Sequence, residues 1–458
     1  MSSKYQLKSA KLYDPITQKY GASLDAMISE ISIVESIDFP GIRATISVSD
    51  SVSGYTKFVG NEYIVLQFTL PDLQQSKSYF LKVYRVGPII RLEKRAKYNI
   101  ECISQEAYLN ESTNVFGSFK EKKVSEIVKQ LLTDTKFGIK VEESKLNLEN
   151  IEETKDKFKC VIPNMRVFDA INWLAGKGVR TKKKGDIYQS GFIFYENDDG
   201  FHFKSFDKII EDALNFKEYT SKNKYKVVHP VYRYYPKKIT NDSVDVGVIE
   251  SISYPDVFNR TLPLRNGSYA GFYGTVALDV VSNSKISTPK NKQAPFSSTP
   301  WSLLGGKGMK AIYDAQSHLG NINPFKKGQD DLANIPRRMR LRGNMIHAWD
   351  KAGDENIKLD TGEVQQRTED TAIYNFCRKF TFEAVKLQIR VAGNCALHVG
   401  NPITVEIPKM LADKGKEEMD DVYTGVYIIV GVRHKIGGDV MHTELVLVKD
   451  SLGSAKGK

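Results

Sequence analysis

"VGNPITVEIP" at residues 399–408 is the stretch that decides the fold, because the chain has already used the same opening once. Residues 59–71 read "VGNEYIVLQFTLP", with the same tripeptide, an extended apolar stretch and a proline. The matching structural positions are Val59-Gly60-Asn61 and Val399-Gly400-Asn401. This repeat indicates two related β modules, one near each end of the chain.

The resemblance between the two modules continues beyond the tripeptide. Val-Gly recurs downstream of each tripeptide, at Val86 after the first and at Val430 after the second. Ile100 then follows Val86 at nearly the same separation as Leu445 follows Val430. Three predicted strands in one order and with similar spacing favour a duplicated barrel. The alternative is that two small β modules share a common turn by chance.

Apolar periodicity divides the chain into four units. Residues 1–110 predict a first tube-like antiparallel barrel, because runs such as "IRATISVSDS" and "YIVLQFTL" alternate between turn residues. Residues 111–215 predict an α/β domain, with helical spacing in "VSEIVKQLL" and "FDAINWLA" and a hairpin at "NDDG". Residues 216–265 together with 383–458 predict the second tube-like barrel. Residues 266–382 form an insertion with a basic loop rich in Pro, Ser and Gly and a helix at about 368–382.

Composition excludes several classes of protein. The start of the 458-residue chain has no apolar stretch typical of a signal peptide, and the longest apolar runs, such as "GVYIIVGV", are too short to span a bilayer. We therefore expect a soluble protein without a membrane segment. The four cysteines are far apart and have apolar neighbours, which predicts buried free thiols in a reducing compartment.

Positive charge is concentrated in one segment. Residues 284–342 contain seven Lys and four Arg against three Asp, or +8 of the chain's net +11. Our hypothesis is that this segment docks on an acidic neighbour, which charge reversal would test. The candidate docking residues are Arg337, Arg338, Arg340 and Arg342, with Met339 and Leu341 facing a core. The alternative is that the basic segment 284–342 binds nucleic acid. A second stretch, at 224–239, favours this alternative because its tyrosines are interleaved with basic residues.

Candidate chemical sites are weak. A three-residue turn over 437–439 would place His434 opposite His442, with Glu444 as a third ligand, but a closed zinc site needs four. The glycine clusters at 175–180 and 303–310 do not fit the spacing of a phosphate-binding loop and are predicted to be ordinary loops. We therefore assign no metal ligand and no cofactor.

No arrangement in the sequence indicates catalysis. Nucleophile motifs are missing, the hairpin turn explains Asp198 and Asp199, and the edge of the first barrel explains Glu101. We therefore expect a structural protein and assign no catalytic residue. A cell-wall-degrading tail enzyme is the remaining alternative, because no sequence spacing excludes a pair of carboxylates across a cleft.

Three ordered segments resemble a known family. They are "NIECISQEAYLNE", then "PNMRVFDAINWLA" followed by "GFIFYENDDGFHFKSFD", and the ending "TGVYIIVGVRHKIGGDVMHTELVLVKDS". Together they resemble the central hub protein of the baseplate of contractile-tailed bacteriophages, and more distantly the hub part of the type VI secretion spike. The basic segment and the length of the central part depart from this pattern.

The resemblance implies an α+β, β-rich fold with two similar tube-protein-like barrels plus mixed α/β domains. Three copies would form a pseudo-sixfold trimeric ring, so the chain would be a homotrimeric adaptor between a sixfold tail tube and a threefold spike. The implied partners are a tail-tube or tube-initiator hexamer, a trimeric spike protein, and baseplate wedge and tape-measure proteins. The implied location is the tail baseplate of a virion, assembled in the host cytoplasm. The repeat alone leads to the same adaptor, because two similar barrels in each of three chains present six similar faces.

Overall fold

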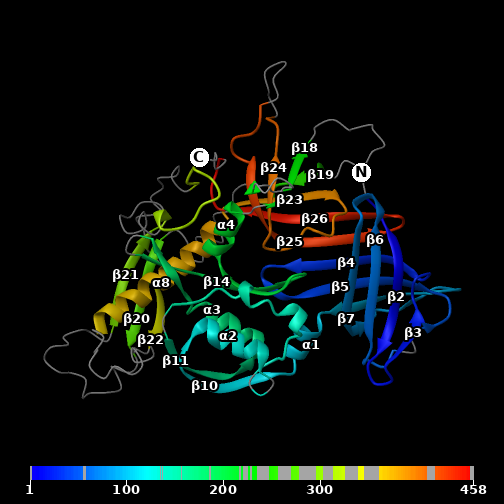
Figure 1. The fold of residues 1–458 in the computed structure, drawn as a ribbon, viewed down its shortest axis with the longest axis horizontal. Coiled ribbons are helices and arrows are strands. Elements are labelled where there is room, and N and C mark those ends of the chain that lie inside the picture. The colour runs from blue at the N-terminus through cyan, green and yellow to red at the C-terminus, as the bar shows by residue number, and fades with distance from the viewer. Residues whose placement is uncertain are drawn as a thin grey trace.

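The computed structural model is rich in β-structure, as Figure 1 shows, and confirms the predicted α+β class. It describes residues 3–54, 58–134, 136, 138–155, 157–184, 187–215, 218–219, 225–226, 230–234, 247–255, 270–277, 296–302, 313–324, 339–344, 361–409 and 418–453. No helix in this described part is long and apolar enough to cross a membrane.

The N-terminal third is almost entirely β-structure. Its strands are β1 (Ser3–Lys4), β2 (Gln6–Asp14), β3 (Lys19–Ser23), β4 (Ile28–Ser36), β5 (Phe39–Asp50), β6 (Tyr63–Leu70), β7 (Gln75–Val86), β8 (Ile90–Arg91) and β9 (Ala96–Ile103). The sequence predicts β4 to β9 but not β2 and β3. Only Ala10 is buried in β2, so the alternation of apolar and polar residues that indicates a strand is weak there.

The middle of the chain mixes helices and hairpins. It contains α1 (Gln105–Asn110), β10 (Asn114–Lys123), α2 (Val124–Thr133), β11 (Lys157–Arg166), α3 (Val167–Ala175), β12 (Val179–Lys184), β13 (Ile187–Ser190), β14 (Phe192–Asn197), β15 (Gly200–Ser205) and α4 (Phe206–Leu214). The predicted helices are confirmed: Val124, Ile127, Val128, Leu131 and Leu132 of α2 are all buried. The turn Asp198-Asp199 joins β14 and β15, as the "NDDG" motif predicts.

The rest of the chain returns to strands around one long helix. The elements are β16 (Glu218–Tyr219), β17 (Tyr225–Lys226), β18 (Val231–Tyr234), β19 (Val248–Ser253), β20 (Ala270–Ala277), β21 (Phe296–Ser302), β22 (Met339–Asn344), α8 (Thr361–Phe382), β23 (Val385–Ala392), β24 (Pro402–Glu406), β25 (Gly425–Gly437) and β26 (Val440–Lys449). Helix α8 begins earlier than the predicted residue 368 and ends where the sequence predicts.

Six of these C-terminal strands close into a barrel. The order of pairing is β19–β23–β26–β25–β24–β18, and β18 pairs back with β19. Leu387, Ile389 and Val391 alternate inward from β23, as their spacing predicts. We call these six strands the C-terminal strand set.

Six N-terminal strands are paired in an equivalent order, β4–β5–β9–β7–β6–β2. We call them the N-terminal strand set. The pairings of the first five strands are antiparallel in both sets. The last strand differs: β2 is antiparallel to β6, whereas β18 is parallel to β24.

The two sets also share register. One row of directly paired residues crosses four strands in each set. The N-terminal row is Ile31, Ile46, Ile100 and Val86, and the C-terminal row is Ile252, Ile389, Leu445 and Val432. The regular pairing of residues between strands is also interrupted at the same place next to this row. The interruption lies between Val83 and Arg85 of β7 in the N-terminal set and between Ile429 and Gly431 of β25 in the C-terminal set. Ile100 therefore matches Leu445, as the sequence spacing predicts, but Val86 matches Val432 rather than Val430.

The two sets are joined edge to edge within the chain. Residues 431–437 of β25 pair with residues 36–30 of β4, and Figure 1 shows β26, β25, β4 and β5 lying side by side. Three C-terminal residues, Cys395, Ile436 and Met441, are buried in the hydrophobic core of the N-terminal set. The joint is therefore packed as well as hydrogen-bonded.

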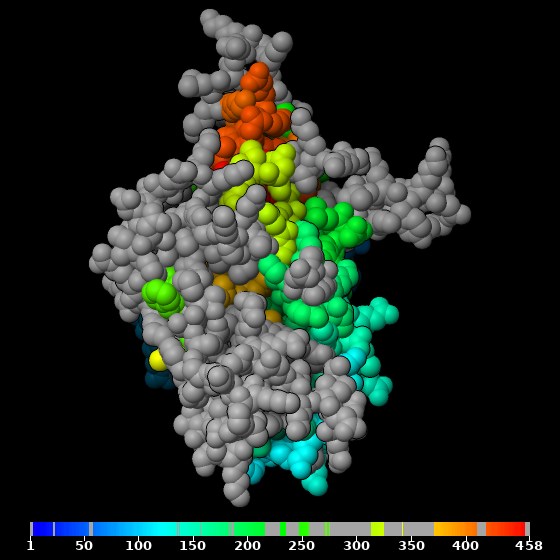
Figure 2. Space-filling model, turned by 90° about the vertical axis from the view of Figure 1, so that its left-hand side faces the viewer, coloured from blue at the N-terminus to red at the C-terminus, as the bar shows by residue number. Residues whose placement is uncertain are grey.

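The segment 313–324 ties the mixed middle region to the C-terminal set. Ala315 O accepts a hydrogen bond from Gln189, and Leu319 N donates one to Asp450 at the end of β26. Figure 2 shows this yellow-green segment between the green middle region and the orange strands. All four cysteines are free thiols, and three of them are buried as predicted, whereas Cys160 is only partly buried.

Candidate assembly interface

The two Val-Gly-Asn tripeptides form similar turns at the start of equivalent strands. Gly60 has φ +100° and Gly400 has φ +89°, a conformation that favours glycine. The amide of Val83 donates to Glu62 O at 3.0 Å, and the amide of Ile429 donates to Asn401 O at 3.0 Å. Glu62 directly follows the first tripeptide, whereas Asn401 is the last residue of the second. The two tripeptides are therefore offset by one residue relative to the equivalent hydrogen bonds.

The surroundings of the two turns are opposite. Val399 is fully buried, whereas Val59 is 81% exposed. The amide of Val399 donates to Glu35 of β4, and its carbonyl accepts from Asn197 of β14. The C-terminal turn is thus covered by the rest of the same chain, and the N-terminal turn is not.

A buried polar cluster holds the covered turn. The carboxylate of Glu35, which is fully buried, lies 3.0 Å from His398 Nδ1 and 3.2 Å from the amide of Val399. Burial lowers the pKa of His398, but the hydrogen bond and the charge of Glu35 outweigh this effect, so the pKa is raised. Asp198 lies 3.9 Å from His398 Nε2 and forms an ion pair with Lys77 of β7. The cluster therefore connects both strand sets and the β14–β15 hairpin.

The predicted facing pair of histidines is wrong. The turn after β25 contains two residues, Gly438 and Asp439, so His434 lies opposite Thr443 and not opposite His442. His434 is buried against Thr443, whereas His442 Nδ1 lies 3.2 Å from Glu250. Among the described residues, no three His, Cys, Asp or Glu side chains are grouped so as to hold a metal ion.

Two buried histidines predict a loss of stability in acid. Burial lowers the pKa of His434 and of His202 to about 3. Both are neutral above pH 6.5 whether folded or unfolded, but below this pH the unfolded chain binds protons that the folded chain does not. Each should therefore cost about 1.4 kcal/mol per pH unit below 6.5, or about 2 kcal/mol at pH 5.

Urea unfolding at pH 7.5 and pH 5.0 checks this expectation. His434→Gln should reduce the loss of stability between these pH values by about 2 kcal/mol. His398→Gln is the matched control with the opposite sign, because a raised pKa contributes stability below pH 6.5 that is lost as the pH rises. It should make the acid loss steeper. An unchanged pH dependence in His434→Gln would contradict the assignment of His434 as buried and neutral.

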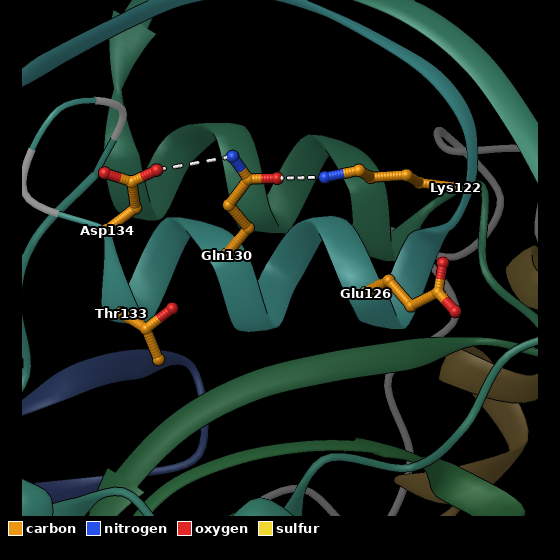
Figure 3. A pocket seen from close by; sticks show the side chains of 5 residues that line it. All are labelled: Lys122, Glu126, Gln130, Thr133 and Asp134. Carbon is orange, nitrogen blue, oxygen red and sulfur yellow. Dashed lines mark hydrogen bonds between the residues drawn. The ribbon is translucent and has the colours of Figure 1, made fainter.

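A surface hollow of about 650 Å³ lies along α2 and is lined by Lys122, Glu126, Gln130, Thr133 and Asp134. Figure 3 shows Gln130 hydrogen-bonded to both Lys122 and Asp134. Glu126 lies in the first turn of α2, whereas Asp134 directly follows the helix, eight residues further along the chain.

The candidate docking arginines are only partly within the described residues. Arg337 and Arg338 lie outside them, as do residues 303–310 of the second glycine cluster. Arg340 and Arg342 belong to β22, which pairs in parallel with β20. The prediction that Leu341 faces a core is wrong, because this residue is 61% exposed.

The tyrosine-rich stretch at 224–239 contributes to a core where it is described. Tyr232 of β18 is buried in the C-terminal barrel, and its hydroxyl accepts a hydrogen bond from Asn394. This side chain is therefore not available to stack on a base, which is the contact a single-strand binder would need.

The residues that form the joint were missed by sequence reasoning. The pairing of β25 with β4 links strands near opposite ends of the chain, and no local pattern signals it. A signal existed for Glu35, because Ile31 and Ile33 share its face of β4. A carboxylate on that apolar face must find a buried partner, and here it finds His398.

No protein-family model matches the chain, and no curated protein matches it in sequence. Solved structures match over nearly its whole length. A tail protein from Neisseria meningitidis MC58 has 10% identity, a TM-score of 0.47 and coverage of 98% of both chains. The 43 kDa tail protein of prophage MuSo2 from Shewanella oneidensis has 9% identity, a TM-score of 0.47 and coverage of 97% of this chain and 99% of the other.

A further match is the E. coli c3393 protein, a component of the type VI secretion system. It has 8% identity and a TM-score of 0.40, with coverage of 97% of this chain and 76% of the other. Two of these three structures are therefore of tail proteins, and the third is of a type VI secretion component.

Proposed function

We propose that this protein is the structural hub of a phage tail baseplate. In this proposal three copies form a ring in which N-terminal and C-terminal strand sets alternate, so six similar units surround a threefold axis. The ring joins a sixfold tail tube or tube initiator on one side to a trimeric spike on the other. Its location is the tail baseplate of the virion.

The single observation that supports this proposal is the duplicated strand order. Five strands of each set share order, direction and register, and even the ladder interruption recurs at the same position. A second interruption also recurs, between Ile28 and Glu30 in one set and between Ile249 and Ser251 in the other. Two units this similar, joined edge to edge, are what a pseudo-sixfold ring of three chains requires.

Native mass spectrometry of the purified chain tests the proposal. The particle should have three times the mass of the 51.7 kDa chain. Electron microscopy should show six lobes around a threefold axis. A chain that stays monomeric, or a particle with twofold symmetry, would refute the adaptor.

The hub acts by shape and needs no catalysis in this proposal. A peptidoglycan turbidity assay checks this part, since clearing that depends on one acidic residue would overturn it. The basic segment 284–342 is proposed to dock on an acidic neighbour in the baseplate. Salt-dependent binding of random DNA by the isolated chain would instead favour the nucleic-acid alternative.

A further inference from the structure

The mixed middle region contains a small sheet that helices cover on one side. Strands β10 and β11 form this two-stranded antiparallel sheet. The side chains on its inner side are buried in one hydrophobic core with α2 and α3; they are Val115, Phe119, Phe158 and Ile162. Figure 1 shows β10 and β11 along the lower edge of the molecule, with α2 and α3 above them. We call the opposite side of this sheet the β10–β11 face.

Exposed apolar side chains lie at one end of the β10–β11 face. Phe116 of β10 is 73% exposed and Val161 of β11 is 60% exposed. Ser118 is paired directly with Val161, and Phe116 lies two residues before Ser118, so the two apolar side chains are diagonal neighbours on one face. Pro163, two residues beyond Val161, is exposed as well. Neighbouring apolar side chains on a free surface indicate a contact with another protein.

Positive charge lies next to this apolar patch. The two strands contain five Lys and one Arg against a single acidic residue, Glu121. Three of the basic side chains have partners within the chain; they are Lys122, Lys123 and Arg166. No ion pair to a described carboxylate is formed by the other three, which are Lys120, Lys157 and Lys159. The face is therefore apolar at one end and positively charged at the other.

The edges of the sheet are protected against the addition of another strand. Two register shifts interrupt the pairing, and Glu121, within one of them, has φ +58°. Bulges, lysines and proline are the features that protect exposed strand edges. This protection accounts for the lysines and for Pro163, but not for an exposed phenylalanine. A partner is therefore expected on the face, where a helix would cover the sheet as α2 and α3 cover its other side.

We propose that the β10–β11 face binds an acidic amphipathic helix of another protein. An apolar side chain of that helix packs on Phe116 and Val161, and its carboxylates contact Lys159 and Lys157. These lysines lie two and four residues from Val161, or about 7 and 13 Å along the strand. Helix positions four and eight residues apart are separated by about 6 and 12 Å, so one side of a helix matches both spacings. The contact does not depend on the proposed ring, because β10 and β11 belong to neither strand set.

A synthetic peptide is the probe for this contact. It is an alanine-rich helix of about 18 residues with a leucine, followed by glutamates four and eight positions later. Labelled with fluorescein, it should bind the full chain, as measured by fluorescence anisotropy. The same peptide with lysines in place of the glutamates should not bind. Added salt should weaken the binding, because surface charges are screened.

Removal of the apolar anchor tests the first half of the contact. Phe116→Ala should raise the Kd of the acidic peptide at least about 10-fold. Because Phe116 is exposed, the variant should unfold at the same urea concentration as the unchanged chain. Tyr20→Ala is the matched control, since Tyr20 of β3 is 64% exposed and lies outside the proposed contact. It should leave the Kd unchanged.

Charge reversal tests the second half. Lys157→Glu combined with Lys159→Glu should also raise the Kd at least about 10-fold, and it should remove most of the salt dependence. Lys11→Glu combined with Lys19→Glu is the matched control, because these exposed lysines belong to β2 and β3. It makes the same change in net charge and should leave the Kd unchanged.

Each outcome decides the inference. Binding that needs both Phe116 and the lysine pair would support it. Failure of the acidic peptide to bind would overturn it, as would binding that survives both sets of substitutions, since the probe would then sit elsewhere, for example on the basic segment 284–342. A DNA oligonucleotide bound through Lys157 and Lys159 without any effect of Phe116→Ala would assign the face to nucleic acid and also overturn it. The mass of the particle tests the proposed hub separately.

Discussion

Replacing Arg378 with methionine should lower the free energy of unfolding by about 3–5 kcal/mol at pH 7, because it leaves buried carboxylates without their partner. Arg378 lies on α8 and is fully buried. Its guanidinium is 3.2 Å from Asp207 Oδ1 and 3.1 Å from Asp450 Oδ2, and it donates to Ser317 O at 2.6 Å. The side chain thus holds α4, the segment 313–324 and the end of β26 together.

The pH dependence of this variant distinguishes a lost ion pair from lost packing. Burial raises the pKa of Asp450, but hydrogen bonds and nearby positive charges outweigh it and keep the pKa low. Without Arg378 that carboxyl should be protonated more readily, so the destabilisation should shrink as the pH falls from 7 to 5. Lys379→Met, at the exposed neighbour on the same helix, is the control and should change stability by less than about 0.5 kcal/mol. A loss for Arg378→Met that does not vary with pH would contradict the ionic role.

The strands and helices that depend on the local pattern of apolar residues could be predicted from the sequence. Strands β4 to β9 and helices α2 and α3 follow from apolar alternation or from a helical stripe, because one face of each is buried. The matching of Ile100 with Leu445 was predictable for the same reason, since duplicated strands keep their spacing. These features depend on residues near one another in the chain.

Features that depend on distant residues or on one turn residue were not predictable. The fully buried Arg378 falls among charged and apolar residues on α8, and only the fold brings Asp207 and Asp450 to it. The histidine pair failed because a turn of two residues instead of three moves each partner by one position and to the opposite face. The β25–β4 joint is central to the proposed site, but neither strand alone contains a sequence pattern that predicts their pairing.

The two glycines of the repeated tripeptide should differ sharply when each is replaced with alanine. Gly60→Ala should cost about 1–2 kcal/mol, because a side chain at positive φ is strained while no atom lies within 4 Å of the added Cβ. Gly400→Ala carries the same strain, but its Cβ would also overlap the hydroxyl of Tyr195, with Tyr195 Cζ only 2.9 Å away. Overpacking of this kind adds about 1–3 kcal/mol, so the total should reach about 2–5 kcal/mol.

Urea unfolding of the two alanine variants side by side measures this difference, with each serving as the control for the other. Tyr195 lies on β14 and is buried, so it has little room to retreat from a methyl group at Gly400. Combining Gly400→Ala with Tyr195→Phe removes the overlapping oxygen and should recover part of the loss, whereas Gly60→Ala should gain nothing from Tyr195→Phe. Equal costs at Gly60 and Gly400 would mean that the covered turn is not packed against β14, and the contrast between the covered and uncovered ends of the two strand sets would lose its basis.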